Sequence, residues 1–288
     1  MKDYVFAGGT AVLTGAASGI GEALATALAA RGSSLVLLDR DGDRLASVAA
    51  RLRAAHPALT VRTHVVDLGD REATAATAAA LLAQEPRITL LINNASVATL
   101  GRFDQTDLDQ VWALLDVNLR GTIHLTHALL PALKASPGAH LANVSSAFGL
   151  LAAPRQAAYV ASKFAVRGFT EALRAELRPL GIGVTSVHPG GTDTRLPHNA
   201  RPGAGVPEDE ARVEFAAFER ILTIKPERVA EAVLDGIERR RPRVLIGWTA
   251  RVPDLLVRLA PGAYTHGTAA FEAVVGWGLP RVLRRRRR

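Results

Sequence analysis

Residues 10 to 39 constrain the fold more than any other part of the chain. The apolar run Thr10 to Leu13 predicts a short buried strand, and Glu22 to Arg31 predicts a helix that Gly32 ends. A glycine-rich turn, Thr14 to Gly21, separates the strand from the helix, and a second apolar run, Leu35 to Leu38, follows. A strand, a glycine turn, a helix and a strand in this order form the first unit of a parallel sheet.

The glycine-rich turn has the spacing G-x-x-x-G-x-G. Glycine lets the backbone turn tightly and approach a pyrophosphate, and the free N–H groups and dipole of the following helix stabilise that anion. The turn therefore predicts a dinucleotide site. The residues expected to contact the cofactor here are Gly15, Ser18, Gly19, Ile20 and Gly21.

Asp39 lies at the end of the second predicted strand, 18 residues after Gly21. A carboxylate at this place can accept hydrogen bonds from the adenosine ribose hydroxyls, and it repels a 2′-phosphate. Arg40 follows directly and would partly offset that repulsion. We therefore expect a preference for NAD, with NADP as the alternative. A turn or helix-capping role ahead of Asp41 is the other interpretation of Asp39.

Strands and helices continue to alternate after this first unit. Further strands are predicted at Val61 to Val66, Thr89 to Ile92, Ala139 to Val144, Val184 to Val187 and Arg243 to Ile246, and helices at Asp43 to Ala55, Arg71 to Ala83, Leu108 to Leu133, Gln156 to Arg178 and Pro226 to Arg239. Strands separated by helices favour a parallel sheet with right-handed crossovers. The predicted fold is α/β, with a single Rossmann-like, doubly wound parallel sheet covered by helices on both faces in three layers.

The alternation breaks between residues 191 and 224. Prolines and glycines there precede an amphipathic segment that holds Phe215 and Phe218. A long irregular insertion after the carboxyl end of a strand is a usual place for a substrate lid. We therefore expect residues 191–224 to cover a substrate site.

The composition narrows the class of protein. The chain has 288 residues, 48% of them apolar, and no cysteine, so it should fold without disulfides or thiolate metal sites. None of its apolar runs reaches the ~18 residues that a membrane-spanning helix needs, and we expect a soluble, cytoplasmic protein. The histidines lack the spacing of metal ligands, so no metal is expected. His188, beside Pro189, is the one histidine expected near a cleft.

The formal charge of +8 belongs mostly to the C-terminus. Arg281 and Arg284 to Arg288 carry six positive charges, which leaves +2 for the rest of the chain. We expect residues 1–250 to form one catalytic domain, and residues 251–288 to form a helical extension with a basic tail that is not an independent domain. The tail is expected to be solvated. Its binding to nucleic acid or, together with residues 271–283, to an anionic membrane surface is the alternative.

Three polar residues in the middle of the chain point to a reaction. Tyr159 and Lys163 are four residues apart in a predicted helix, so the phenol and the ammonium lie on one face about one turn apart. A free phenol, with a pKa of about 10, is a poor acid or base near neutrality, and a neighbouring cation lowers that pKa. Ser146, with twelve residues between it and Tyr159, would hold a substrate oxygen beside the phenol. A helix that carries Tyr and Lys by chance is the other interpretation.

Several short motifs occur together in one order. They are Thr14 to Gly21, Asp67, Asn93-Asn94-Ala95, Asn118, Ser146, Tyr159, Lys163 and Pro189-Gly190. In this order and at these spacings they resemble the short-chain dehydrogenase/reductase family over roughly residues 5 to 250. The resemblance implies an NAD(P)-dependent oxidoreductase that interconverts a secondary alcohol and a ketone by hydride transfer.

The resemblance implies a role for each matching catalytic position. Tyr159 would be the general acid in ketone reduction and the base in alcohol oxidation. Lys163 would lower the pKa of Tyr159 and bind the nicotinamide ribose, and Ser146, rather than Ser145, would orient the substrate oxygen. Asn118 would kink its helix and hold a water in a proton relay to Lys163; an ordinary buried amide is the other interpretation.

The same resemblance places further residues beside the cofactor. Asp67 would meet the adenine ring. The other cofactor residues implied are Leu68, Asn94, Ala95, Pro189, Gly190, Thr192 and Thr194. Two positions depart from the family pattern. Ser96 replaces a glycine and would crowd the cofactor slightly, and Thr192 stands where a branched aliphatic residue is common, which leaves the contact to the carboxamide open.

Apolar residues near the predicted cleft favour an apolar or bulky substrate. The substrate candidates are Val97, Phe148, Leu196, Phe215 and Phe218, together with Ser146 and Tyr159. A reductase of carrier-protein-bound 3-oxoacyl groups is the alternative enzyme, although its preference for NADP and its shorter C-terminus count against it. A dinucleotide-binding sensor of the same fold is the non-enzyme alternative, and the presence of Tyr159 and Lys163 counts against it. The resemblance also implies a homodimer or homotetramer packed through the long helices that carry Asn118 and Tyr159.

Overall fold

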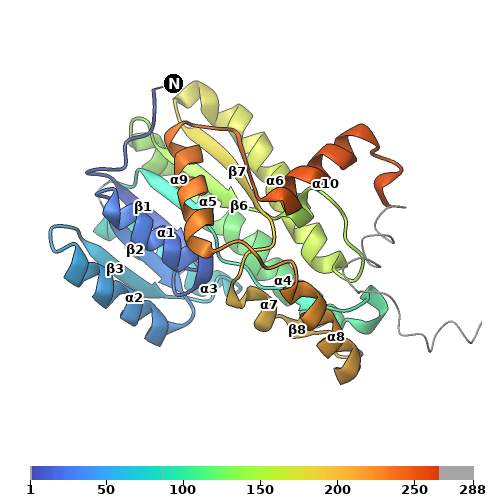
Figure 1. The fold of residues 1–288 in the computed structure, drawn as a ribbon. Coiled ribbons are helices and arrows are strands. Elements are labelled where there is room, and N and C mark those ends of the chain that lie inside the picture. Colours follow the sequence, from blue (N-terminus) through green and yellow to red (C-terminus); the bar gives the residue numbers. More distant parts are fainter. Residues whose placement is uncertain (1, 86, 266–288) are drawn as a thin grey trace, which may run out of the picture.

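The computed structural model describes residues 2–85 and 87–265. Its centre is a sheet of seven strands in the order β3-β2-β1-β4-β6-β7-β9, all parallel (Figure 1). The strands are β1 Thr10–Thr14, β2 Ser34–Asp39, β3 Val61–Val65, β4 Leu90–Asn93, β6 His140–Val144, β7 Gly183–Pro189 and β9 Arg243–Ile246. The order reverses between β1 and β4, the point at which a doubly wound sheet forms a crevice at the carboxyl ends of its strands.

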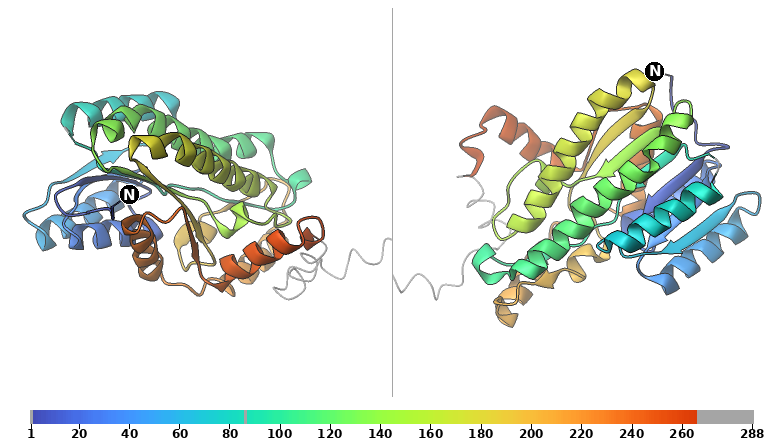
Figure 2. Two further views of the ribbon diagram at one scale, coloured as in Figure 1. Left: turned by 90° about the horizontal axis from the view of Figure 1, so that it is seen from above. Right: turned by 180° about the vertical axis from the view of Figure 1, so that it is seen from behind.

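Helices cover both faces of the sheet, as Figure 2 shows. One face packs against α1 Gly19–Ala30, α2 Gly42–Ala55 and α9 Pro226–Glu238, and the other against α3 Arg71–Gln84, α4 Leu108–Leu115, α5 Thr122–Ala135 and α6 Ala157–Leu177. The predicted three-layer α/β architecture is therefore confirmed.

Neighbouring strands carry their apolar side chains in register. Val12 on β1 lies opposite Leu91 on β4 and faces the core beneath α3 and α5. The next residue, Leu13, lies opposite Ile92 and faces the core beneath α1 and α9. Because successive strand residues point to opposite faces and both faces are buried, the strands read as unbroken apolar runs. Each buried leucine contributes about 1.5–3 kcal/mol to the stability of the fold.

The single helix predicted from Leu108 to Leu133 is interrupted in the structure. Helix α4 passes into a turn of π-helix, Asp116–Gly121, before α5 begins. A Cβ added to Gly121 would come within 2.8 Å of the Leu68 side chain, so the helix approaches the connection after β3 closely at this point. Close packing of this kind determines where a helix widens, and apolar periodicity does not reveal it. The sequence therefore predicted one continuous helix, and this prediction was wrong at the π-helical turn.

The predicted lid contains regular structure of its own. Within residues 191–224 lie α7 Arg195–His198, β8 Arg201–Pro202 and α8 Glu208–Glu219. Strand β8 pairs in parallel with β5 Thr99–Leu100, which follows β4. The lid is thus hydrogen-bonded, in a separate two-stranded sheet, to the segment that follows β4.

An ion-pair cluster joins α8 to the loop that precedes α6. Arg155 contacts both Glu210 and Glu214, and all three side chains are largely shielded from solvent. Gln105 donates a hydrogen bond to Glu210 at 3.1 Å. Arg155 has a φ of 64°, a left-handed conformation that costs a non-glycine residue about 1–2 kcal/mol. The surrounding contacts therefore hold this backbone in an unfavourable conformation.

The chain after β9 forms α10 Trp248–Leu259, so the expected domain boundary at residue 250 falls inside a helix. Helix α10 lies beside β9 and the 3₁₀ turn Ala147–Gly149 that follows β6. The second expected helical piece and the basic tail fall largely on residues 266–288, outside the described residues. Among the helices of residues 2–85 and 87–265, none is long and apolar enough to cross a bilayer.

Candidate active site

A cavity of about 570 Å³ opens at the carboxyl ends of the central strands. The turns after β1, β2, β4, β6 and β7 line much of it, and residues from the lid and α10 close the rest. The cavity therefore lies where the strand order reverses and extends from there toward the C-terminal helix.

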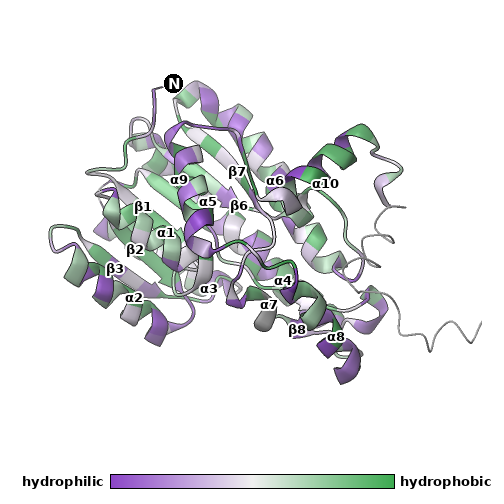
Figure 3. Cartoon of the chain, viewed as in Figure 1, coloured by the Kyte–Doolittle hydropathy of each residue, from purple (hydrophilic) through white to green (hydrophobic). Residues whose placement is uncertain are grey.

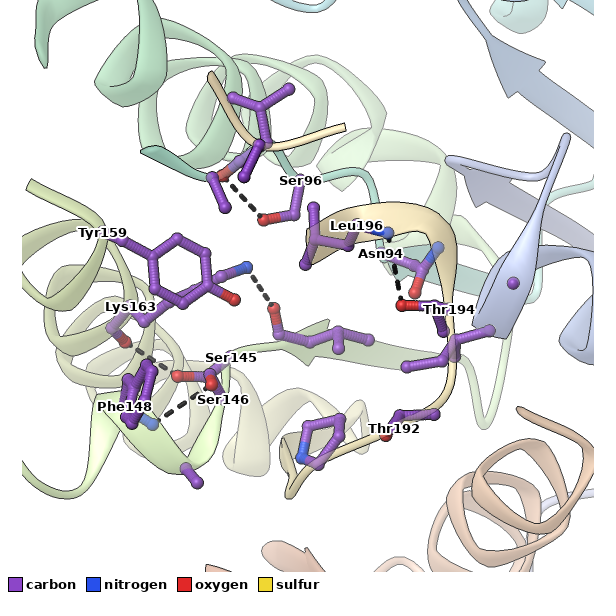
Figure 4. Close-up of a pocket in the computed structure, with 18 of the residues that line it drawn as sticks. Asn94, Ser96, Ser145, Ser146, Phe148, Tyr159, Lys163, Thr192, Thr194 and Leu196 are labelled. Atoms are coloured by element: carbon purple, nitrogen blue, oxygen red, sulfur yellow. Dashed lines mark hydrogen bonds between the residues drawn. The ribbon is translucent and has the colours of Figure 1, made fainter. Parts of the chain in front are cut away.

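Tyr159 and Lys163 lie one turn apart on α6, and both line the cavity (Figure 4). The Nζ of Lys163 donates to the backbone oxygen of Val144 at 3.1 Å and lies 5.6 Å from the centroid of the Tyr159 ring. Lys163 is only 2% exposed. Burial disfavours the charged ammonium and lowers the pKa of Lys163 to about 7. This amine can therefore gain or lose a proton near neutrality.

The Tyr159 phenol keeps its proton at neutral pH. Burial raises the pKa of Tyr159, and hydrogen bonds with the side chains of Ser146 and Ser96 oppose that rise. The direction differs from the lowering expected from Lys163, because burial is the largest effect on this phenol. Ser96 stands where the family pattern has glycine, and it places a second hydroxyl beside the phenol (Figure 4).

The two serines after β6 have different environments. The Oγ of Ser145 donates to the backbone oxygen of Lys163 at 2.8 Å, and this serine is buried. The Oγ of Ser146 accepts a hydrogen bond from the backbone N of Phe148 at 3.1 Å and shares a second one with Tyr159. Ser146 is thus the serine whose hydroxyl lies beside the phenol, while Ser145 joins β6 to α6.

We expected His188 near the cleft, but this residue does not line the cavity and lies behind Ser146. Its Nδ1 is 3.0 Å from the backbone oxygen of Ser146, and its Nε2 is 2.9 Å from the Oγ of Ser186. Burial lowers the pKa of His188 to about 4, so the ring is neutral at pH 7. A carbonyl oxygen only accepts, so Nδ1 carries the proton and donates to Ser146. Among the described residues, no group of three or more His, Asp or Glu side chains could hold a metal ion.

Asn118 occupies the π-helical turn and is buried outside the cavity lining. Its Oδ1 accepts from the backbone N of Val97 at 2.8 Å, and its Nδ2 donates to the Val97 backbone oxygen at 2.9 Å and to Ser162 Oγ at 3.1 Å. The amide therefore joins the turn after β4 to the helix that carries Tyr159. Its side chain positions two walls of the cavity.

The glycine turn brings backbone close to backbone. Gly15 and Gly19 have φ angles of 67° and 55°, which glycine adopts readily. A Cβ on Gly15 would lie 2.8 Å from the Cα of Ala95, and one on Gly21 would lie 1.8 Å from the carbonyl oxygen of Gly15. Gly21 is absent from the cavity lining and packs α1 against the turn, while its contact with a cofactor stays a prediction. The space left before the N-terminus of α1 fits a pyrophosphate.

The Asp39 carboxylate lines the cavity and is held by backbone groups. Its Oδ2 accepts from the backbone N of Ala17 at 2.9 Å, and its Oδ1 accepts from the backbone N of Asp41 at 3.0 Å. The carboxylate therefore has a turn-forming role and also faces the cavity. Arg40 and Arg44 line the cavity as well. The sequence prediction included Arg40 and missed Arg44, which is in the first turn of α2.

Most of the predicted site residues line this cavity. On the cofactor side they are Gly15, Ser18, Gly19, Ile20, Asp39, Arg40, Asp67, Leu68, Asn94, Ala95, Pro189, Gly190, Thr192 and Thr194, and on the substrate side Val97, Ser146, Phe148, Tyr159, Leu196 and Phe218. Phe215 does not line it. Only the carboxyl-terminal end of α8 and the residues after it, such as Phe218 and Ile221, reach the cavity, and Phe215 lies about one turn further back.

The largest set of lining residues that the sequence prediction missed comes from α10 and the residues that follow it. They are Thr249, Pro253, Leu256, Val257, Ala260, Ala263 and Tyr264. Positions 253, 256, 257 and 260 follow the i, i+3, i+4, i+7 spacing of a buried helix face. That spacing was the available signal that one face of α10 is buried.

Comparison with known proteins identifies the family. Residues 9–205 match the family described as short chain dehydrogenase. A Mycobacterium tuberculosis protein named as an oxidoreductase, SadH, is 39% identical over 272 residues, which cover 93% of this chain and 96% of that protein. The dehydrogenase/reductase SDR family member 7B of Xenopus laevis is 36% identical, over 86% of this chain and 76% of that protein.

Solved structures agree with the sequence matches. A short-chain dehydrogenase/reductase from Burkholderia phymatum, in complex with NAD, has a TM-score of 0.80 and 30% identity, over 91% of this chain and 96% of that one. A short-chain dehydrogenase from Sphingobium yanoikuyae, in complex with NADPH, has a TM-score of 0.73 and 30% identity, over 89% and 95% of the two chains. The protein therefore belongs to the short-chain dehydrogenase/reductase family, whose members are NAD(P)-dependent oxidoreductases.

Proposed function

We propose that this protein interconverts a secondary alcohol and a ketone, with Tyr159 as the proton donor and acceptor. The observation that carries the proposal is the buried phenol of Tyr159 beside Ser146, with Lys163 one turn away, in the cavity that the glycine turn also lines. A dinucleotide bound along that turn would share this cavity with the substrate.

The proton chemistry follows from the environment of each group. In ketone reduction the neutral phenol of Tyr159 donates its proton to the carbonyl oxygen, and Ser146 holds that oxygen by a hydrogen bond. Lys163 has a pKa of about 7 and lies close to the Tyr159 ring. When its amine is protonated, Lys163 can stabilise the phenolate that Tyr159 becomes after it gives up its proton. When bound, the nicotinamide supplies the hydride in reduction and accepts it in oxidation.

We propose NAD as the preferred cofactor. Two backbone N–H groups hold the Asp39 carboxylate in place. The carboxylate would therefore stay close to a 2′-phosphate bound at this end of the cavity and repel it. Arg40 and Arg44 oppose this repulsion, which makes the preference modest. The two solved relatives carry NAD in one case and NADPH in the other and so favour neither choice.

The substrate is proposed to be apolar or bulky. One wall of the cavity contains Phe148, Leu151, Phe218 and Val257, which pack together from three separate segments. Burial of an apolar substrate against such a wall gives about 25 cal/mol per Å² of apolar surface. This lining suits an apolar alcohol or ketone, and a carrier-bound 3-oxoacyl group, whose chain is also apolar, stays the alternative substrate.

The protein is proposed to form a homo-oligomer through α4, α5 and α6. These helices expose Leu108, Trp112, Ile123 and Phe164 on the outside of one layer. Light scattering on the purified protein would test this, beside a Trp112→Glu variant. A monomeric parent protein would contradict the proposal.

Turnover assays test the proposed reaction. The absorbance of the reduced nicotinamide would be followed while the protein receives NAD or NADP with a panel of secondary alcohols, beside Tyr159→Phe. We expect faster turnover with NAD and a rate lower by a factor of about 10²–10⁴ in the variant, because the general acid–base is lost. Fluorescence titration should give similar binding of NADH to both proteins.

Two outcomes would redirect the proposal. Undiminished turnover in Tyr159→Phe would remove this tyrosine from the mechanism. Tight NADH binding with no reaction of any alcohol or ketone would favour a dinucleotide-binding sensor of the same fold instead.

A further inference from the structure

Helix α10 exposes a row of apolar side chains beside the active-site cavity. Trp248, Val252, Leu255, Leu256 and Leu259, the α10 row, have exposed fractions between 49% at Val252 and 74% at Leu259. With 3.6 residues per turn, these five positions fall within a sector of about 100° on the helix. Figure 3 shows apolar residues recurring along α10. A continuous apolar sector of this kind marks an interaction surface more strongly than scattered exposed leucines.

The charges beside the α10 row have one sign. Arg251 and Arg258 lie next to each other along the same edge of the row, and the Arg258 side chain is 70% exposed. The acidic residue of the helix, Asp254, is buried; it contacts Arg243 and lies 3.8 Å from the Arg258 guanidinium, whose side chain still stays largely exposed. An apolar helix face bordered by arginines, with a tryptophan in it, is typical of helices that lie in the plane of a membrane surface.

The sequence beyond the described residues has the same character. Residues 266–288 are 23 residues long and follow in the sequence after Thr265, the neighbour of the cavity-lining Tyr264. They contain six arginines and a single acid, Glu272, among apolar residues. Clustered arginines beside apolar residues are attracted to anionic headgroups by roughly 1 kcal/mol each.

We propose that the α10 row docks this protein on an anionic lipid surface. The apolar side chains would enter the boundary between headgroups and acyl chains, and Arg251 and Arg258 would face the phosphates. In an antiparallel pair of α10 helices a second copy of the chain would bring arginines against arginines, whereas lipid phosphates offer these arginines the opposite charge, so we favour a lipid surface over self-association through this face.

Docking here would place the lipid at the entrance of the cavity. Leu256 is 55% exposed and also lines the cavity, so the α10 row continues into the substrate wall. An apolar alcohol or ketone dissolved in the lipid could enter past Leu256 without crossing water. This consequence rests on the proposed function, whereas the docking does not.

Vesicle flotation with the full-length protein tests the docking. Vesicles of phosphatidylcholine alone and vesicles containing phosphatidylserine would be compared at low and high salt. Leu255→Glu/Leu259→Glu changes two residues of the α10 row that do not line the cavity. Val5→Glu/Leu180→Glu is the matched control, because these residues are 71% and 55% exposed and lie on the side of the amino ends of the strands.

We expect the parent protein to float with the anionic vesicles at low salt and to be released at high salt. The α10 double variant should bind these vesicles at least tenfold more weakly than the parent, and the Val5/Leu180 control should bind within about twofold of it. Circular dichroism should give the same spectrum for all three proteins.

Three results would overturn the docking. They are absence of binding by the parent protein, equal loss of binding in the α10 and control variants, and loss of binding on deletion of residues 266–288 with none in the α10 variant. A parent dimer that Leu255→Glu/Leu259→Glu converts to a monomer would assign the face to a second copy instead. Flotation needs no turnover, so failure of the proposed reaction would leave this result intact.

Discussion

The two ends of the active-site cavity are built from different parts of the chain. At the cofactor end, backbone meets backbone, and Gly15 lies so close to Ala95 that no Cβ fits between them. At the substrate end, side chains such as Phe148, Phe218 and Val257 meet from three separate segments. A change at the cofactor end therefore disturbs folding and binding together, whereas a change at the substrate end should alter which molecules fit. Four variants test this contrast, from the largest expected effect to the smallest.

Gly21→Val should have the largest effect. Its Cβ would lie 1.8 Å from the carbonyl oxygen of Gly15, so α1 must move away from the turn. We expect a loss of about 3 kcal/mol or more in the free energy of unfolding and no measurable NADH binding. Gly168→Ala is the control, because it also lies in a helix but has no atom within 4 Å of the added Cβ, and it should gain about 0.5–1 kcal/mol. Urea unfolding of both variants checks the contrast, and comparable stabilities would refute it.

Arg155→Leu should loosen the lid and leave the cofactor end intact. The substitution leaves Glu210 and the buried Glu214 without their cation. Removal of one partner of a buried pair costs about 3 kcal/mol when, as here, the pair keeps some exposure to solvent. Hydrogen exchange should become faster in α8 and stay unchanged in α1. Arg167→Leu, which breaks a more exposed pair with Glu171, is the control and should change neither. Equal acceleration in both helices would mean that the lid is not a separate unit.

Lys163→Met should change how stability depends on pH. The pKa of Lys163 is about 7 in the folded protein and near 10.4 when unfolded, so between these values the unfolded chain holds a proton that the folded chain lacks. Stability of the cofactor-free protein should therefore rise with pH from about 7 toward 10, by at most ~1.4 kcal/mol per pH unit. The raised pKa of Tyr159 reverses this trend above about pH 10, because the unfolded phenol ionises first. Urea midpoints across this range should be flatter in the variant, and an unchanged slope would contradict the assignment.

Phe218→Ala should have the smallest effect and act on the substrate alone. Loss of this ring from the cavity wall should lower kcat/KM for an apolar alcohol about tenfold, which corresponds to about 1.4 kcal/mol. The dissociation constant of NADH should stay the same. Val213→Ala, at an exposed position of the same helix, is the control and should behave as the parent protein does. Weaker NADH binding in Phe218→Ala would contradict the proposal that the cofactor end and the substrate end of the cavity act separately.

The parts of the structure that could be predicted from the sequence are those set by neighbouring residues. The strand, glycine turn, helix and strand from Thr10 to Asp39 depend on local apolar runs and on glycine conformations, and they formed where expected. The spacing of Tyr159 and Lys163 likewise needs only a helix. Features of this kind can be predicted because the residues that form them are neighbours in the sequence.

The parts that could not be predicted depend on contacts between distant segments. Phe215 and Phe218 look alike in the sequence, and only the packing of the end of α8 against Phe148 distinguishes them. The pKa of Tyr159 depends on how deeply α6 is buried, which spacing does not reveal. Helix α10 had an apolar periodicity, but nothing in the sequence indicated which cavity it would cover.

The π-helical turn at Asp116–Gly121 limits how the length of this chain can vary during evolution. Removal of one residue there would turn every following residue of α5 by about 100° around the helix axis. Leu125, Leu129 and Leu133 would then leave the core that they fill. Insertions and deletions should therefore accumulate in exposed connections such as residues 57–58, while the turn that holds Asn118 should keep its length.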